Sequence, residues 1–427
     1  MAAVDSIANA AVSAAEVAGM SVAVERNGRT IVARGYGLAD REANVKADSA
    51  TVYRIGSITK QFTAAAIMKL VEEGKIKLDE PIQTYLPGYP TGTNRVLVRH
   101  LLNHTSGIRS YTSLGPRWFS RSSTDLPTDS IIAMFRDEPF DFAPGADFRY
   151  NNSGYFLLGR IIENVSSKPY AQFVTERFFR PLGLGATSYC PNEPARPQHA
   201  MGYNRNAGGL SVALPISMTH PYAAGALCSN VLDLLRWWNA LEGGKVVSAV
   251  SYKAMTRPDT LAGGRPMRYA YGLSTGDLGT HKAIAHGGGI NGFVTYLGRY
   301  PADSLTVVVL TNTEGPVADR SALAIARIAL NVPAARALPV SVADRKRYVG
   351  SYTANNFTVA IREDGEGLIA QATNQAPTQL THRGNGRFTS MAAPGQVLVF
   401  QVEGDKAVRL AIEVDEKAVW TGTREGR

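Results

Sequence analysis

The chain has 427 residues, of which 44% are hydrophobic and 19% charged, as expected of a globular protein with a sizeable core. Its net charge is +9, but the basic residues are dispersed and the densest group is the triplet Arg345-Lys346-Arg347, so nucleic acid is not an expected partner. No stretch approaches about 18 consecutive apolar residues, which excludes a transmembrane segment.

The N-terminus and the cysteines are the sequence features that relate to the cellular compartment of the protein. Residues 1–17 are rich in alanine but carry no basic residues ahead of a hydrophobic block, so they do not form a signal peptide. Cys190 and Cys228 are the two cysteines. They are too few for a zinc site by themselves, and they form either a disulfide or two unrelated buried thiols.

Helices and a hairpin are predicted at the front of the chain. Apolar residues at helical spacing predict a helix over 7–17 and another over 57–73, which Gly74 ends. Between them, two β-type runs flank Asn27-Gly28, a pair that is typical of hairpin turns.

The middle of the chain is richer in loops. Residues 85–150 contain many Pro, Gly, Ser and aromatic residues with little periodicity. Two helices, three strands and a last helix are predicted after them: a helix over 155–165, a helix that Ser229 caps and Gly243-Gly244 ends, strands near 284, 294–297 and 305–310, and a helix over 318–330. The two ends of this region therefore predict one antiparallel sheet flanked by helices, with an inserted all-helical subdomain, an α/β (α+β) fold.

The composition changes after residue 330. Pro333, Pro339 and the alanine-rich stretch between them predict a linker over 333–345, so the first domain is expected over 1–332. Short alternating segments then predict a small all-β barrel domain over 346–427. Its expected strands include 357–361, 396–402, 407–414 and 418–421.

Ser57-Ile58-Thr59-Lys60 places a hydroxyl and an amine three residues apart at the start of a predicted helix. On a helix the two side chains share a face, one turn apart. A serine hydroxyl needs a base to take its proton, and a desolvated lysine is such a base. No other lysine in the chain follows a serine at this spacing, so Ser57 and Lys60 are the candidate nucleophile and base.

Tyr150-Asn151-Asn152 precedes the helix predicted over 155–165, and Tyr-x-Asn occurs nowhere else in the chain. A tyrosine near a lysine ammonium can relay protons to and from a leaving group. An amide two residues on can bind a substrate carbonyl and hold the lysine. The alternative interpretation of Tyr150 is a half-buried aromatic residue in a turn.

His286-Gly287-Gly288-Gly289 lies between two predicted strands. Consecutive glycines in a strand indicate the close approach of a ligand or another backbone, or a simple bulge. The backbone N–H groups of Gly289 and Ser57 are candidates for an oxyanion hole.

Together these motifs resemble the serine β-lactamase and penicillin-binding-protein superfamily, specifically its class C-like esterase, D-aminopeptidase and DD-carboxypeptidase branch. The resemblance spans roughly residues 15–332. Five segments carry it: Tyr53 to Lys60, Leu101 to Ile108, Tyr150 to Gly154, Leu232 to Leu241, and His286 to Phe293.

The resemblance implies a role for each catalytic candidate. Ser57 is the nucleophile, Lys60 its base and Tyr150 the proton relay, while Asn152 orients the substrate and the lysine. It also implies an active site between the sheet and the helical subdomain, and a lipocalin-like barrel at the C-terminus.

The chain departs from the family pattern at the third motif. His286 stands where β-lactamases carry the lysine of Lys-Thr-Gly, which contacts a substrate carboxylate, and Gly288 is expected to bind substrate beside it. No Lys-Thr-Gly occurs in the chain. Because histidine carries less positive charge than lysine at neutral pH, efficient β-lactam hydrolysis is not expected. A preference for carboxylate substrates should rise as the pH falls through about 6–7, the usual range of a histidine.

Two further features have open interpretations. His104 invites a pairing with Ser57, but its His-Thr-Ser-Gly segment recurs in the family as a structural turn, and Lys60 already supplies a base. Tyr111, Trp118 and Phe119 either line an acyl pocket or close a small core.

We therefore predict a serine hydrolase that acts through an acyl-enzyme on esters, amides or short peptides, including those with D-residues. The alternatives are a catalytically silent peptide- or penicillin-binding module, and an acyltransferase or cyclase. We expect no metal or organic cofactor and no partner beyond a small-molecule or peptide substrate; the oligomeric state is not predicted. By the resemblance, the protein is periplasmic or secreted if a signal peptide was removed, and otherwise cytoplasmic.

Overall fold

The chain forms two compact units, Met1–Val332 and Pro333–Arg427. The computed structural model describes residues 1–194, 197–206, 208–333, 338–354, 357–365, 367–372, 378–390, 396–414 and 417–426. Across these ranges, no helix combines the length and the apolar character that crossing a membrane requires.

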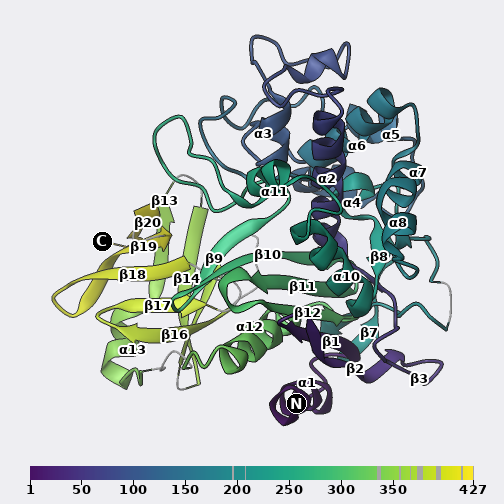
Figure 1. The fold of residues 1–427 in the computed structure, drawn as a ribbon. Coiled ribbons are helices and arrows are strands. Elements are labelled where there is room, and N and C mark those ends of the chain that lie inside the picture. The colour runs from purple at the N-terminus through teal and green to yellow at the C-terminus, as the bar shows by residue number, and fades with distance from the viewer. Residues whose placement is uncertain are drawn as a thin grey trace. The chain divides into compact units, whose positions relative to one another are not determined.

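A seven-stranded antiparallel sheet forms the centre of the first unit (Figure 1). Its strands have the order β3-β2-β1-β12-β11-β10-β9, so the front of the unit pairs with its back. The strand bounds are β1 Gly19–Arg26, β2 Arg29–Asp40, β3 Val45–Lys46, β9 Ser274–Leu278, β10 His281–Ile290, β11 Phe293–Tyr300 and β12 Leu305–Thr311. The predicted hairpin at Asn27-Gly28 is the β1–β2 connection, where both residues have positive φ.

Helices cover both faces of this sheet. On one face, α1 (Ala2–Ser13) and α12 (Val317–Ala329) pack against the valines of β1 and β12. On the other face, α10 (Val231–Glu242) contacts the same two strands. Because both faces are covered, β12 is buried along its whole length.

The region inserted between the halves of the sheet is mainly helical. Its α-helices are α2 Thr59–Glu72, α3 Val98–Leu102, α4 Pro116–Phe119, α5 Thr128–Ala133, α6 Asn152–Ser166, α7 Tyr170–Val174, α8 Arg180–Leu182, α9 Tyr222–Gly225 and α11 Ala249–Thr256, together with α10. The tighter or wider helical turns are η1 Gly56–Ile58, η2 Ile82–Thr84, η3 Tyr111–Ser113 and η4 Thr175–Phe179, with η5 Pro301–Asp303 after β11.

Short strands also occur in this insertion, beyond the helices that the sequence predicts. A three-stranded sheet has the order β4-β8-β5, and β6 and β7 form a hairpin. The bounds are β4 Tyr53–Arg54, β5 Ser188–Tyr189, β6 Tyr203–Asn206, β7 Gly209–Val212 and β8 Leu227–Ser229.

The start of α10 differs from the prediction. Ser229 was expected to cap the helix, but it belongs to β8 and its hydroxyl bonds to Thr187. The cap is Asn230, whose side chain accepts a hydrogen bond of 2.8 Å from the N–H of Asp233. Asparagine and serine are both good N-caps, so the pairing of β8 with its neighbours decides between them.

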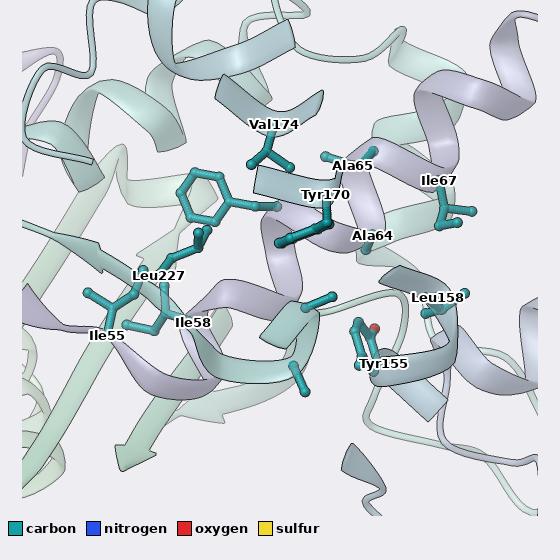
Figure 2. Packing of buried hydrophobic residues seen from close by; sticks show 14 of the residues in the cluster. Ile55, Ile58, Ala64, Ala65, Ile67, Tyr155, Leu158, Tyr170, Val174 and Leu227 are labelled. Atoms are coloured by element: carbon teal, nitrogen blue, oxygen red, sulfur yellow. The ribbon is translucent and has the colours of Figure 1, made fainter. Parts of the chain in front are cut away.

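Helix α2 lies at the centre of the larger core, and most of its residues are buried. Figure 2 shows side chains from α2, α6 and α7 packed together here: Ala64, Ala65, Ile67, Tyr155, Leu158, Tyr170 and Val174. The small alanines allow neighbouring helices to approach closely. This packing fixes the helix whose first turn carries the predicted base Lys60 and which directly follows the turn of the predicted nucleophile Ser57.

The second unit is a closed eight-stranded barrel with neighbouring strands in chain order. Its strands are β13 Gly350–Ala354, β14 Phe357–Asp364, β15 Gly367–Ala372, β16 Thr378–Gly384, β17 Arg387–Ser390, β18 Gln396–Glu403, β19 Lys406–Val414 and β20 Lys417–Arg424. Tyr352, Phe388 and Phe400 are at the centre of its core. The predicted all-β barrel fold is confirmed.

The predicted linker differs from the structure at its C-terminal end. Residues 334–337 of the range 333–345 lie outside the described residues. The end of that range forms helix α13 (Val342–Tyr348), where the Ser341 hydroxyl accepts a hydrogen bond of 3.0 Å from the N–H of Asp344. This helix is short, and its capping serine is its main sequence signal.

Candidate active site

Ser57 lies in the tight turn η1, directly before α2. On either side of this turn, Ile55 and Ile58 are fully buried and anchor it in the core. Gly56 has a φ of 51°, and a Cβ on it would come within 2.9 Å of the Gly289 nitrogen. A glycine is therefore needed for the turn to lie against β10, and the hydroxyl of Ser57 faces a cavity.

Lys60 lies one turn further on and is fully buried. Its Nζ is 3.0 Å from Ser57 Oγ, 2.9 Å from Asn152 Oδ1 and 2.9 Å from the carbonyl oxygen of Ala224. Burial lowers the pKa of Lys60 well below its usual value. The structure thus brings the predicted serine, lysine and asparagine into contact.

These three contacts suit a neutral lysine. The oxygens of Asn152 and Ala224 only accept hydrogen bonds, so they take two N–H groups of the amine. The third direction points at the hydroxyl of Ser57, where the lone pair of a neutral amine can accept a proton. The geometry is that of a general base beside a nucleophile.

Tyr150 and Asn152 reach the site from the start of α6. The Asn152 amide donates a hydrogen bond of 3.2 Å to Thr112 Oγ1, which leaves its oxygen for Lys60. The Lys60 Nζ lies 4.7 Å from the centre of the Tyr150 ring. Burial around the hydroxyl raises the pKa of Tyr150, and a hydrogen bond with Ser57 lowers it.

Strand β10 forms the opposite wall of the site. A Cβ on Gly288 would come within 2.1 Å of the Ile55 carbonyl oxygen and 2.3 Å of Thr295 Oγ1, so only glycine fits there. Gly289 lines the same cavity as Ser57.

His286 does not change charge near neutral pH, contrary to the sequence expectation. Burial, together with the nearby charge of Lys60, lowers its pKa to about 3. Its Nδ1 lies 2.5 Å from the Gly287 carbonyl oxygen, to which it donates, so Nε2 accepts from the hydroxyl of Tyr269 at 2.8 Å. Both ring nitrogens are thus engaged. Tyr269 was not singled out from the sequence because it lies in no motif.

The cavity at Ser57 has a volume of about 110 Å³. Tyr111 and Trp118 line it, whereas Phe119 is 57% exposed and does not. Ile216, Pro221, Ala224 and Ile290 are lining residues that the sequence analysis missed. Ile216 and Pro221 lie outside helices and strands and Ala224 lies in the short helix α9, where no motif occurs, whereas Ile290 ends β10 within the segment His286 to Phe293. None of the described residues that line the cavity has a charged side chain.

A disulfide joins Cys190 to Cys228, which resolves the two alternatives left open by the sequence. Cys228 lies in β8, a few residues after the Ala224 carbonyl that accepts from Lys60. The bond closes a separation of 38 residues, so it restrains this side of the site.

Comparison with known proteins agrees with this geometry. A family model described as Beta-lactamase matches residues 4–331. The D-aminopeptidase of Brucella melitensis biotype 2 (strain ATCC 23457) is 26% identical over 376 residues, which are 87% of this chain and 71% of that protein. Protein flp of Staphylococcus aureus (strain MRSA252) is 27% identical over 315 residues, which are 72% of this chain and 62% of that protein. The chain spans between 58% and 71% of the lengths of three curated relatives that it matches.

Two solved structures are also similar to this chain. The octameric penicillin-binding protein homologue from Pyrococcus abyssi has a TM-score of 0.71 at 27% identity, with 97% of this chain and 98% of that chain covered. The D-amino acid amidase from Ochrobactrum anthropi SV3, in complex with D-phenylalanine, has a TM-score of 0.68 at 25% identity, with 77% and 98% covered.

Proposed function

The chain belongs to the β-lactamase family, and we propose that it is a serine hydrolase that cleaves amides or short peptides, including those of D-amino acids, through an acyl-enzyme on Ser57. The observation that carries the proposal is the buried amine of Lys60, 3.0 Å from Ser57 Oγ. A buried lysine whose pKa is lowered by burial is suited to act as the base that activates the serine.

Acylation follows from the arrangement of these groups. The Ser57 hydroxyl transfers its proton to Lys60 Nζ while Oγ forms a bond to the substrate carbonyl carbon. The N–H groups of Ser57 and Gly289 hold the resulting oxyanion. When the carbon–nitrogen bond breaks, the departing amine takes a proton from Tyr150, which Lys60 replenishes. The product of this half-reaction is an ester between Ser57 and the acyl group.

Deacylation uses the same groups in reverse. A water molecule gives a proton to the Lys60–Tyr150 pair as its oxygen attacks the acyl carbon. The bond to Ser57 Oγ then breaks, the serine regains its proton, and the carboxylic acid leaves.

The cavity supports compact acyl groups with an apolar side chain. Its volume of about 110 Å³ and its lining by Tyr111, Trp118 and Ile216 suit a compact apolar side chain. Relatives named D-aminopeptidase and D-amino acid amidase support amides of D-amino acids as the first substrates to test. Because His286 is neutral and takes the place of the family's lysine, we propose that β-lactam hydrolysis is weak or absent.

An oxidising compartment is the location that we propose. The Cys190–Cys228 disulfide supports it, because disulfides form and persist outside the reducing cytoplasm. Periplasmic or secreted placement agrees with the family resemblance.

The test compares the wild type with Ser57→Ala on D-alanine p-nitroanilide and L-alanine p-nitroanilide. We expect turnover of the D-substrate in preference to the L-substrate. Ser57→Ala should lower kcat by a factor on the order of 10⁴–10⁶, and a fluorophosphonate probe should label the wild type alone.

Each alternative predicts a different result. Labelling of Ser57 without turnover of any amide or ester would indicate a silent binding module. Transfer of the acyl group to an added amine in preference to water would indicate an acyltransferase. Turnover that survives Ser57→Ala would contradict the mechanism.

A further inference from the structure

Tyr150 lies at the end of a segment, residues 139–151, that has neither helix nor strand. The loop 104–107 supports this segment through three backbone hydrogen bonds. They run from Asp141 N–H to the Gly107 oxygen (2.7 Å), from Gly145 N–H to the Thr105 oxygen (2.8 Å) and from Arg149 N–H to the His104 oxygen (3.0 Å). The backbone that carries the tyrosine is therefore held by the His-Thr-Ser-Gly loop.

His104 makes a further contact through its side chain. Its Nδ1 accepts a hydrogen bond of 3.1 Å from the N–H of Asn151. Since its carbonyl oxygen accepts from Arg149, this one residue holds the backbone on both sides of Tyr150. The centre of its ring also lies 4.4 Å from that of Tyr150.

The surroundings of the His104 ring offer it little other polar contact. Its side chain is almost completely buried, and within the described part of the chain Nε2 has no hydrogen-bond partner. Burial of an unpaired polar atom costs stability, so the polar contribution of this ring lies at Nδ1. Burial lowers the pKa of His104 well below its usual value, which keeps Nδ1 an acceptor.

The exposure of Tyr150 and the irregular segment that carries it explain why its position needs such support. The residue is 39% exposed, whereas Lys60 and His286 in the same site are buried. An exposed ring on an irregular segment has more conformational freedom than a residue within a helix. The proton relay depends on the position of this hydroxyl.

We propose that His104 is the positioning residue of Tyr150: through Nδ1, its carbonyl oxygen and its ring, it holds the phenol at Ser57 for proton delivery to the leaving group. The inference rests on the proposed function. It assigns His104 no contact with the substrate and no role as a base.

Two substitutions separate the acceptor from the ring. His104→Asn places an amide oxygen where Nδ1 stands and tolerates the φ of 61° at this position. His104→Phe keeps an aromatic ring but has no acceptor. Both are compared with the wild type by kcat and KM for D-alanine p-nitroanilide and the matching p-nitrophenyl ester, together with the thermal midpoint of unfolding.

The leaving group distinguishes positioning from general damage. Amine departure needs a proton and p-nitrophenolate departure does not, so His104→Phe should lower kcat/KM, which reports acylation alone, about 10²-fold for the anilide but only about threefold for the ester. KM for the anilide should stay within about twofold, because the cavity is unchanged. His104→Asn should keep the anilide kcat within about fivefold of the wild type.

Other outcomes overturn the inference. Equal losses for ester and anilide, a phenylalanine variant as active as the wild type, or an asparagine variant as poor on the anilide as phenylalanine would each do so. If His104→Phe does not fold, His104→Gly, which suits the positive φ, replaces it with the same expected selectivity. A wild type that turns over neither substrate would overturn the proposed function itself, and the inference with it.

Discussion

Lys60 and Tyr150 both contact the hydroxyl of Ser57, and proton transfer in the proposed mechanism passes through both of them. We expect Lys60→Ala and Tyr150→Phe each to lower kcat/KM for an anilide by a factor on the order of 10²–10⁴. The double variant should lose much less than the product of the two factors, because the residues act as a unit. Steady-state kinetics of the four proteins measures this coupling.

Lys69, a surface lysine of α2, the helix that also carries Lys60, provides the control. Lys69 pairs with Glu72 on the exposed side of α2, and Lys69→Ala should leave kcat/KM unchanged. If kcat/KM of the double variant instead falls by the full product of the two single factors, Lys60 and Tyr150 act independently.

Single residues show what sequence can predict at this scale. The Ser57–Lys60 pair was predictable because helix geometry places residues three apart on one face. The charge state of His286 was not, since it depends on burial in the folded chain, which no local motif encodes. The Ala224 carbonyl that accepts from Lys60 is a backbone atom and leaves no side-chain signal.

Helix α12 places an acidic side chain next to strand β10. Asp319 lies in its first turn, and its Oδ1 is 3.4 Å from the position that a Cβ on Gly287 would occupy. Burial raises the pKa of Asp319 from 3.8 to about 6. The protonated acid is thus favoured in the folded state, and its stabilising effect is present below pH 3.8 and lost as the pH rises through about 6.

We therefore expect Asp319→Asn to be more stable than the wild type at pH 7.5 by about 1–3 kcal/mol, with the difference smaller at pH 4.5. The upper figure corresponds to the full shift, and partial solvent contact reduces it. Denaturant unfolding at the two pH values measures the difference. Asp129→Asn, which removes an exposed acid from the first turn of α5, is the control; a wild type that is the more stable protein at pH 7.5 would contradict the argument.

Whole elements were predicted best where periodicity was strong. The helices near 57–73, 155–165 and 318–330 are present as α2, α6 and α12. In the range 85–150 the helices have only three to six residues, too few for a helical period to show. The alternation over Met20 to Glu25 predicts the strand that forms β1, although both faces of the sheet are covered and nearly all of its residues are buried.

At the scale of the whole molecule, the proposed boundaries are 1–332 for the first domain, 333–345 for a linker and 346–427 for the barrel. Composition alone suggested this division, since Pro333 follows the last long helix and the strands begin after residue 348. The packing that closes eight strands into a barrel depends on pairing between β13 and β20, which are far apart in sequence. No local pattern could predict that closure.

The first unit is expected to fold and to react with substrate without the C-terminal barrel. Ser57, Lys60, Tyr150 and Gly289 all lie within Met1–Val332, which has its own buried clusters on both faces of its sheet. By contrast, the Leu338 N–H donates to the His382 oxygen, so Leu338 belongs to the barrel. A chain that ends at Pro333 should therefore fold, react with a fluorophosphonate at Ser57, and turn over a small p-nitrophenyl ester within about threefold of the full chain, because every residue assigned to acylation lies within the first unit. Circular dichroism and thermal unfolding establish folding before activity is compared.

A fragment that folds and is labelled but turns over no ester would place part of the deacylation machinery after residue 333. A folded fragment that is not labelled would contradict the assignment of a complete nucleophilic site to the first unit.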